Sequence, residues 1–275
     1  MLGYSGQLAS SLRDITNDAI FASRTSPVKI ELSNADILFD RLSSINPDLI
    51  INAAGFTSVD RCESEKREAY LINGLSLKEI VRYCRVRRKP LIHISTDYVF
   101  DGNDGNYNEE SIPNPINFYG LSKLIGDTFA LSYDESLVVR TSGVFGSSKN
   151  FPMFVVEALK RKESVPVIEG YYSPIFSDFL ARAVIQLIDS GKRGLLNVAG
   201  ERVSRMHFAE LIANKFNLNK NLLVPSKGRM SLAAKRPYDS SLDITRAKGT
   251  LKFDFFTISR NLDEFYKKLN KGKQF

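Results

Sequence analysis

The chain alternates short apolar runs with longer segments in which apolar residues recur every three or four positions. Residues 48–54, 90–96 and 136–141 are nearly continuous runs of apolar and β-branched residues, which is typical of strands buried on both faces of a parallel sheet. The segments 59–84 and 119–132, which separate these runs, have the spacing of amphipathic helices. This alternation predicts an α/β fold with a doubly wound parallel sheet and helices on both of its faces.

The regular alternation changes after about residue 145. Helical spacing persists in places, but the predicted strands become shorter and the loops more frequent. We therefore expect residues 1–145 to form the sheet domain and residues 146–275 to form mainly a smaller mixed α/β lobe that shapes a substrate pocket. Part of the second half, about 165–200, is expected to return to the sheet.

The composition is that of an average soluble globular protein. With 275 residues, of which 43% are hydrophobic and 25% charged, the chain is long enough for a full core and is unlike a disordered or collagen-like sequence. No apolar run approaches the roughly 18–20 residues of a membrane span, and the first residues lack the basic and apolar regions of a signal peptide. We therefore expect a cytoplasmic protein with no membrane partner.

The cysteines and histidines do not predict a metal site. Cys62 and Cys84 are too few for a disulfide scaffold or a cysteine-based zinc site, so each is interpreted as a buried thiol. His93 lies inside a predicted buried strand and His207 stands alone on a predicted helix, which favours structural roles for both. We therefore predict that no metal is bound.

The net charge of +7 includes two clusters of basic residues. No stripe of alternating aromatic and basic residues accompanies either cluster, so we interpret them as solvated helix faces and expect no nucleic-acid partner. A mildly basic surface also suits a small anionic substrate such as a nucleotide diphosphate. The clusters are Arg82, Arg85, Arg87, Arg88 and Lys89, and Lys267, Lys268, Lys271 and Lys273.

A glycine loop opens the chain. Gly3, Gly6 and Ala9 have the spacing G-x-x-G-x-x-A, and the helix-like residues 7–13 overlap its end. In dinucleotide-binding folds such glycines let the backbone approach a pyrophosphate at a helix N-terminus, and a small third residue lets the helix pack against the sheet. The spacing therefore indicates a dinucleotide site, although a glycine pair alone is a weak signal.

The strand that should precede the glycine loop is short. Only Met1 and Leu2 lie ahead of it, whereas a central strand needs about five residues. We therefore expect the first strand to be truncated or missing, through a misassigned start or a truncated chain. A protein without this strand is expected to fold poorly or to bind its dinucleotide weakly.

The residues after the next predicted strand bear on the choice of cofactor. The run 18–22 is followed by Arg24 rather than by Asp or Glu. A carboxylate at this place accepts a hydrogen bond from the ribose 2′-hydroxyl of NAD, whereas an Arg accommodates the 2′-phosphate of NADP. Arg24 therefore favours NADPH, with NADH left open, and the alternative interpretation is an Arg on a surface loop.

Tyr119 and Lys123 are the first candidates for catalysis. On a helix, residues four apart share a face, and a nearby ammonium favours the phenolate and lowers the pKa of the tyrosine. Such a pair can deliver a proton to a substrate oxygen. The end of the run 90–96 strengthens this interpretation, because the hydroxyl of Thr96 would lie at the sheet edge where ligands bind and could bond a carbonyl oxygen.

Three further segments are candidates for the walls of the same site. The small residues of 52–55 follow a predicted strand and would let a cofactor lie close to the backbone. The loop 101–118 is long and rich in Gly, Asn and Pro, so we expect it to form one wall of the active site. Tyr171 and Tyr172 are candidates for lining the pocket.

Together these motifs resemble the extended short-chain dehydrogenase/reductase family over nearly the whole chain, and within it the reductases of 4-keto nucleotide sugars. The resemblance implies a Rossmann-type doubly wound sheet. The block 95–102 is more specific for this branch than the Tyr-x-x-x-Lys pair. The matching segments are the loop 3–8, then 52–60, 62–63, Asn73, 95–102, Pro115, 119–123, 140–142, 236–237 and 240–243.

The resemblance implies roles for individual residues. Tyr119 would donate the proton, Lys123 would orient it and hold the nicotinamide ribose, and Thr96 would polarise the substrate carbonyl. The cofactor contacts would be Gly3, Gly6, Gln7, Leu8, Arg24, Glu31, Leu32, Ala53, Ala54, Gly55 and Thr57, together with Tyr119 and Lys123. The substrate contacts would be Thr96, Asp97, Tyr98, Gly143 and Arg236.

Two of the substrate contacts need comment. Gly143 stands where the resembled reductases often carry an aromatic residue that contacts the sugar, so the identity of the substrate is less secure than the type of reaction. Arg236 is a candidate for the nucleotide diphosphate, because a guanidinium binds phosphate through two parallel hydrogen bonds.

The function implied is the reduction by NADPH of a 4-keto nucleotide sugar, first of all dTDP-4-dehydro-L-rhamnose to dTDP-L-rhamnose. A homodimer is left open. One alternative is a catalytically silent NADP-binding regulatory subunit that resembles the one of methionine adenosyltransferase, which the presence of Thr96, Tyr119 and Lys123 disfavours. The other is a related nucleotide-sugar reductase or epimerase with a different substrate.

Overall fold

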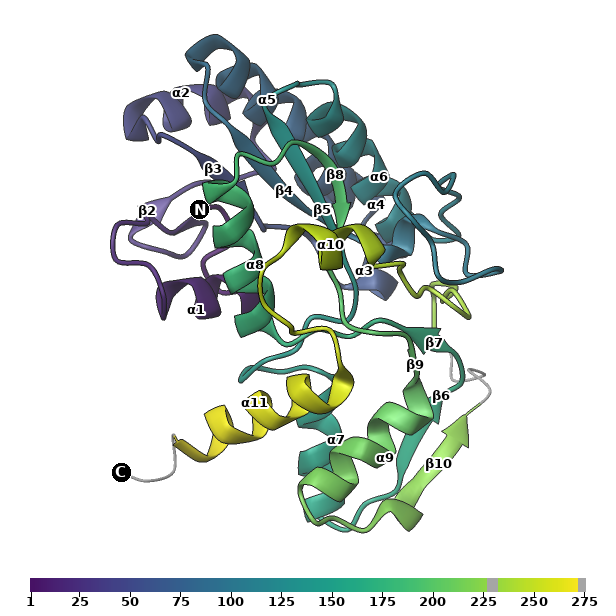
Figure 1. The fold of residues 1–275 in the computed structure, drawn as a ribbon. Coiled ribbons are helices and arrows are strands. Elements are labelled where there is room, and N and C mark those ends of the chain that lie inside the picture. Colours follow the sequence, from purple (N-terminus) through teal and green to yellow (C-terminus); the bar gives the residue numbers. More distant parts are fainter. Residues whose placement is uncertain (227–231, 272–275) are drawn as a thin grey trace.

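A parallel sheet forms the centre of the protein in this computed structural model, which describes residues 1–226 and 232–271 (Figure 1). The order across the sheet is β2, β1, the segment 1–3, β3, β4, β5 and β8. These strands are β1 (Ala22–Ser23), β2 (Val28–Lys29), β3 (Ile50–Asn52), β4 (Leu91–Thr96), β5 (Ser136–Thr141) and β8 (Gly194–Asn197). The predicted doubly wound α/β fold is confirmed.

Helices cover both faces of the sheet, which explains why its strands are apolar on both sides. Ile50 packs in the core formed with α2 (Ala35–Ile45) and α5 (Ser76–Arg87), whereas the next residue, Ile51, packs in the core formed with α1 (Gln7–Arg13) and α8 (Ser177–Asp189). Successive side chains of a strand point to opposite faces. The continuous apolar runs of the sequence therefore serve two cores at once.

The segment ahead of the glycine loop lies in the sheet between β1 and β3. Leu2 forms parallel bridges to Ala22 and to Asn52. Its N–H donates to the carbonyl of Ile51 at 2.8 Å, and its own carbonyl accepts from the N–H of Ala53 at 3.0 Å. Beside this short segment lies a cavity of about 610 Å³ with many apolar residues in its wall. The strand expected before the glycine loop is thus represented by residues 1–3.

Two predicted elements of the first half differ from the structure. The strand expected at 18–22 is only β1, at Ala22–Ser23. The long helix expected over 59–84 is broken into α3 (Val59–Ser64), α4 (Lys66–Ala69), a π-helical turn (Tyr70–Leu75) and α5. The wider turn places Asn73 so that its side chain bonds both the N–H and the carbonyl of Phe56, at 2.8 and 3.1 Å.

A smaller lobe lies below the sheet in Figure 1. Its strands pair with one another rather than with the main sheet: β6 with β10 in parallel and β7 with β9 antiparallel. Of the segment 165–200, therefore, β8 pairs within the main sheet and β6 and β7 do not. The elements of the lobe are α7 (Phe151–Lys160), β6 (Val165–Ile168), β7 (Tyr171–Tyr172), β9 (Val203–Ser204), α9 (Arg205–Lys215), β10 (Leu223–Ser226) and α11 (Ile258–Lys271). Helix α10 (Thr245–Thr250) packs against β8 of the main sheet.

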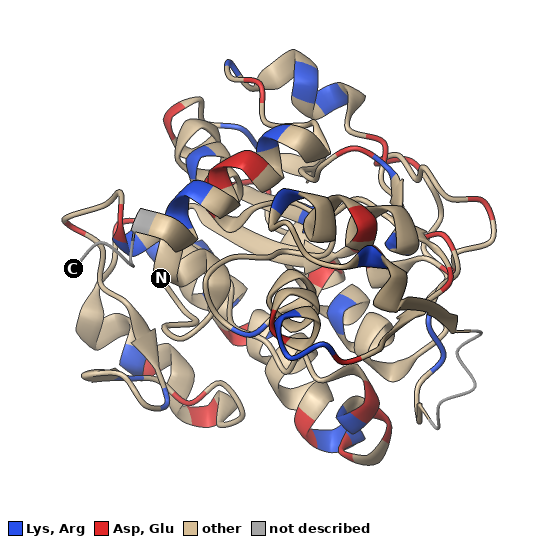
Figure 2. Ribbon diagram, turned by 90° about the horizontal axis from the view of Figure 1, so that it is seen from below, with Lys and Arg blue, Asp and Glu red and all other residues tan. Residues whose placement is uncertain are grey.

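Among the described residues of the two basic clusters, Arg82, Lys89, Lys267 and Lys268 form ion pairs. Arg82 lies 2.9 Å from Glu79, and Lys268 bonds Asp14 at 2.9 Å and Asp178 at 2.6 Å. Blue and red positions are interspersed along the ribbon in Figure 2. Lys273 lies outside the described residues.

Two findings concern the membrane and the cysteines. Within residues 1–226 and 232–271, no helix combines the length and the hydropathy needed to cross a membrane. Cys62 and Cys84 are free and buried, as predicted.

Candidate active site

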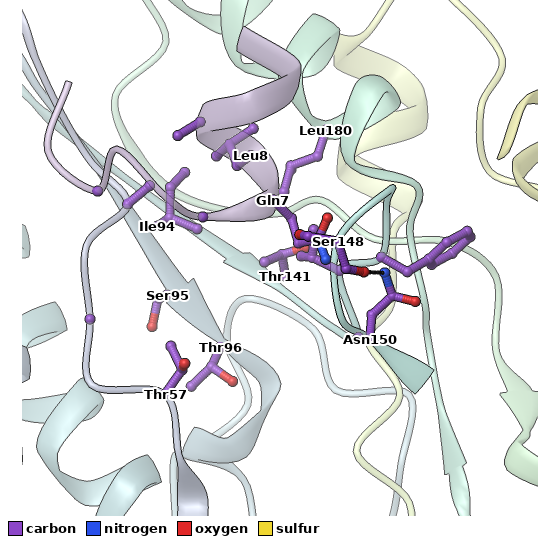
Figure 3. Close-up of a pocket in the computed structure, with 18 of the residues that line it drawn as sticks. Gln7, Leu8, Thr57, Ile94, Ser95, Thr96, Thr141, Ser148, Asn150 and Leu180 are labelled. Carbon is purple, nitrogen blue, oxygen red and sulfur yellow. Dashed lines mark hydrogen bonds between the residues drawn. The ribbon is translucent and has the colours of Figure 1, made fainter. Parts of the chain in front are cut away.

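A cavity of about 560 Å³ opens where the carboxyl ends of β3, β4 and β5 meet the glycine loop (Figure 3). Open parallel sheets bind their ligands at this edge. The structure brings most of the residues predicted from the sequence together in its wall: Gly3, Gly6, Gln7, Leu8, Ala53, Ala54, Gly55, Thr57, Thr96, Asp97, Tyr119, Lys123 and Gly143.

The glycine loop passes close to the backbone that follows β3. Gly3 has a φ of +108°, and a Cβ at this position would lie 2.8 Å from the backbone nitrogen of Ala54 and 2.9 Å from the carbonyl oxygen of Ala53. Only glycine fits both the conformation and the contact. Ala9 is fully buried, as expected of a small residue between helix and sheet. The two backbone segments therefore form one wall of the cavity.

Helix α6 (Phe118–Leu131) carries Tyr119 and Lys123 and packs unusually close to its neighbours. A Cβ on Gly120 would lie 2.0 Å from the carbonyl oxygen of Tyr98, and a Cβ on Gly126 would lie 2.3 Å from that of Asn73. The helix is capped by Asn117, whose side chain accepts from the N–H of Gly120 at 2.8 Å. The glycines therefore set how near the tyrosine and the lysine come to the sheet edge.

Lys123 is buried at the base of the cavity. Its Nζ donates to the carbonyl of Ile94 at 2.7 Å and lies 3.4 Å from Nε2 of His93. The same His93 nitrogen lies 3.6 Å from Oδ1 of Asp127, whose Oδ2 accepts from Nε of Arg140 at 3.2 Å. Burial lowers the pKa of Lys123 to about 8 although Asp127 opposes it. Burial lowers the pKa of His93 well below its usual value, and the positive charge of Lys123 lowers it further. This histidine is therefore neutral.

Tyr119 remains a phenol in this environment. Burial raises its pKa, and a hydrogen bond with the hydroxyl of Thr96 only partly opposes the shift. The ring of Tyr98 stands edge-on to that of Tyr119, with centroids 5.8 Å apart. The prediction that Lys123 lowers the pKa of Tyr119 is wrong for this arrangement, because burial dominates and the ammonium is held by Ile94.

Asp97 holds hydroxyl groups beside the cavity. Its Oδ1 accepts from the hydroxyl of Thr96 at 3.1 Å, and its Oδ2 accepts from Ser142 at 2.7 Å and Ser240 at 2.6 Å. Burial raises the pKa of Asp97, while these hydrogen bonds and Arg205 lower it. The carboxylate accepts from the Thr96 hydroxyl in this structure, so that hydroxyl can donate to Tyr119 or to a substrate oxygen only by turning away from Asp97.

Comparison with known proteins identifies the family of the chain. The family model of the RmlD substrate-binding domain matches residues 1–271. The chain belongs to the RmlD substrate-binding domain family.

Members of the RmlD family and solved structures are similar over most of the chain. A probable low-salt glycan biosynthesis reductase, Agl14 of Haloferax volcanii, is 32% identical over 81% of this chain and 78% of its own. The crystal structure of a hypothetical dTDP-4-dehydrorhamnose reductase of Sulfolobus tokodaii is 46% identical and has a TM-score of 0.89. The match covers 95% of this chain and 97% of that one. The dTDP-4-dehydrorhamnose reductase of Bacillus anthracis in complex with NADP is 27% identical and has a TM-score of 0.90. The match covers 97% of each chain.

Not every residue predicted from the sequence lies on the wall of the RmlD-family cavity. Arg24 is exposed, with Nε 3.9 Å from Oε2 of Glu31. Leu32 is buried in the core beside α2. Tyr98 lies behind Tyr119 rather than in the wall.

Arg236 forms an ion pair in this structure, and its contact with the nucleotide diphosphate remains a prediction. Its guanidinium bonds Oδ2 of Asp60 at 2.7 Å and Oδ1 at 3.3 Å, and it lines a separate cavity with Tyr238. The carboxylate of Asp60 thus takes two parallel donors of the guanidinium.

The turn 148–150 also lines the cavity, and the sequence did not reveal it. Gln7 reaches across the cavity, and its Nε2 donates to the carbonyl of Lys149 at 3.4 Å. Asn150 caps α7 and bonds the carbonyl of Ser148 at 2.6 Å, as the dashed line in Figure 3 shows. The turn belongs to the Gly- and Ser-rich segment 143–150, which follows β5. Because ligands bind beyond strand ends, this segment could have been predicted as part of the site.

The loop 101–118 was expected to form a wall of the site, but the structure places it outside this wall. None of its residues lines the cavity. It packs instead on the C-terminal segment, where Tyr107 donates its N–H to the carbonyl of Ser241 at 2.9 Å and accepts from Asp243 at the same distance.

The wall of the cavity fits a polar ligand. Oγ of Ser95 and Oγ1 of Thr141 are buried without a hydrogen-bond partner, and both residues line the cavity (Figure 3). Buried hydroxyls are normally bonded, so these two groups are open to a ligand. Among the residues that the structure describes, no group of three or more His, Cys, Asp or Glu side chains could hold a metal ion.

Proposed function

We propose that this protein is an NADPH-dependent reductase of a 4-keto nucleotide sugar. The observation that carries the proposal is that Tyr119, Lys123 and Thr96 share one cavity with the glycine loop. A proton donor next to a dinucleotide-binding loop is what a carbonyl reductase requires. The relatives named as reductases, and the one solved with NADP, support the assignment.

The residues along the cavity fit the cofactor. Gly3 and Gly6 leave the backbone open where the pyrophosphate would lie, and a Cβ on Gly6 would meet nothing closer than 3.6 Å. Ala54 and Thr57 would line the path toward Lys123, which would hold the nicotinamide ribose. Arg24 would meet a 2′-phosphate at the exposed end.

The chain supplies the proton and the orientation of the substrate. The bound nicotinamide supplies a hydride to the C4 carbonyl carbon of the sugar. As the C=O π electrons move to oxygen, the phenol of Tyr119 gives its proton to that oxygen and becomes a phenolate, so the product is an alcohol. Solvent then returns a proton to the phenolate, while Lys123 would hold the nicotinamide ribose. Thr96 would bond the same oxygen by turning its hydroxyl away from Asp97.

The test is oxidation of NADPH by a 4-keto nucleotide sugar, followed by the loss of reduced-nicotinamide absorbance. Turnover is expected with dTDP-4-dehydro-L-rhamnose, our proposed substrate, and a panel of other 4-keto nucleotide sugars distinguishes a related reductase. NADPH binding without turnover on any member of the panel would contradict the proposal and favour the silent regulatory subunit.

Arg24→Ala is expected to weaken NADPH binding about tenfold and to leave NADH binding within twofold, because one charge-assisted contact to the 2′-phosphate is lost. Arg24 is exposed and its ion pair with Glu31 is long at 3.9 Å, so the fold should be unaffected. Fluorescence titration of both nucleotides measures the effect. Equal weakening of both would show that Arg24 does not contact the 2′-phosphate.

The turnover number is expected to fall as the pH rises through about 8. Burial lowers the pKa of Lys123 to about 8, so its ammonium, present below this pH, is lost above it. Tyr119 does not cause this fall in the turnover number, because burial raises its pKa. A pH profile of kcat at saturating NADPH and substrate measures the midpoint. A profile flat to pH 10 would show that the charge of Lys123 is not required.

A further inference from the structure

The ring of Tyr172 occupies the space beside Gly143. Gly143 has a φ of +49°, and a Cβ on it would lie 2.7 Å from Cε2 and 2.8 Å from Cδ2 of Tyr172. Gly143 and Tyr172 are 29 residues apart in sequence, yet both line the cavity that holds Tyr119. One volume in the wall is therefore shared by two positions, of which only one can carry a large side chain.

Neighbouring side chains hold the Tyr172 ring in place. Tyr172 pairs with Val203 of β9, and its ring meets that of Phe208 edge-on with centroids 5.9 Å apart. The guanidinium of Arg205 lies over the ring, 5.4 Å from its centroid. Only 9% of Tyr172 is exposed. A ring fixed in this way forms a rigid surface and loses little freedom when a ligand binds.

The position of the ring points to the sugar part of the substrate. Tyr172 lies in the same wall as Asp97 and Tyr119, which are the groups proposed to meet the reacting sugar. The C–H groups of a sugar ring carry a small positive charge and pack on the negative face of an aromatic ring. We propose that Tyr172 is the aromatic wall of the sugar subsite and that Gly143 is glycine to admit it. This inference rests on the proposed function.

The experiment measures how much the sugar adds to binding. Titration calorimetry of the NADP-saturated protein compares dTDP-L-rhamnose with dTDP. In the native chain the sugar is expected to tighten binding about tenfold. In Tyr172→Ala this gain should vanish while the Kd of dTDP stays within twofold. In Tyr172→Phe, which keeps the ring and removes only the hydroxyl, the gain should persist.

Each result separates this inference from the proposed function. If the native protein binds neither nucleotide, the proposed function and the subsite both fail. If it binds both but the sugar adds nothing, or Tyr172→Ala keeps the full gain, only the aromatic wall is overturned. If Tyr172→Phe loses as much as Tyr172→Ala, the hydroxyl rather than the ring is responsible, and the inference is wrong.

A second pair of variants tests the shared volume without relying on the ligand. Gly143→Trp should lower the melting temperature, because its side chain meets Tyr172. The double variant Gly143→Trp with Tyr172→Gly has the same backbone strain at position 143 but no competing ring. It is expected to melt at a higher temperature than Gly143→Trp alone. Equal or lower stability of the double variant would show that the two positions do not share one space.

Discussion

Tyr119→Phe is expected to lower kcat by a factor of about 10² to 10⁴, the usual contribution of a positioned general acid. The phenol is the proposed proton source, and burial keeps it protonated by raising its pKa. Phe retains the ring, so the edge-on contact with Tyr98 at 5.8 Å should survive. Stopped-flow or steady-state NADPH oxidation measures the loss, and the Kd of NADPH should change by less than threefold.

The matched control is Tyr83→Phe. Tyr83 is fully buried, and its hydroxyl has no hydrogen-bond partner, so removing the hydroxyl breaks no hydrogen bond. It lies in the core between α2 and α5, away from the wall of the active-site cavity. This variant should keep the native kcat. A Tyr119→Phe protein as active as Tyr83→Phe would exclude Tyr119 as the proton donor.

Gly120→Ala is expected to destabilise the protein by roughly 3 kcal/mol, the upper end of the range for overpacking, and to lower its melting temperature by several degrees. The added Cβ would lie 2.0 Å from the carbonyl oxygen of Tyr98 and 2.9 Å from its carbon. Both are backbone atoms, so helix α6 must move rather than a flexible side chain. Activity should fall as well, because Tyr119 moves with the helix.

Gly249→Ala provides the control for the helix preference of alanine. Gly249 lies in α10, and nothing is within 4 Å of the place a Cβ would take. Alanine should therefore stabilise this helix by about 0.5–1 kcal/mol. Thermal unfolding of both variants measures the difference. If Gly120→Ala melts at or above the native temperature, the close contact between α6 and Tyr98 does not constrain the site.

The sequence determined the sheet and the elements that line its carboxyl edge. The runs 90–96 and 136–141 became β4 and β5 almost residue for residue, because a strand buried on both faces is marked by a nearly continuous run of apolar and β-branched residues. The Tyr-x-x-x-Lys pair and the glycine loop were local spacings on one helix and one turn. Spacing within one element follows from backbone geometry alone, so these predictions needed no tertiary contact.

Positions that depend on two segments meeting were not available from the sequence. The helix expected at 59–84 is interrupted by a π-helical turn, because Asn73 must reach the backbone of Phe56. Arg236 bonds Asp60, which is 176 residues away in sequence, and no local pattern indicated this contact. The direction of the pKa shift of Tyr119 was misjudged for the same reason, since burial raises this pKa.

The sequence by itself thus determined the type of fold, the family it resembles and the candidate chemistry. Only the tertiary structure decided which groups meet: Tyr172 beside Gly143, Gln7 against Lys149, and the buried His93 beside Lys123. The physical reason is that apolar periodicity is written in neighbouring residues. Packing volumes, hydrogen-bond partners and pKa shifts arise only when distant segments exclude water from one another.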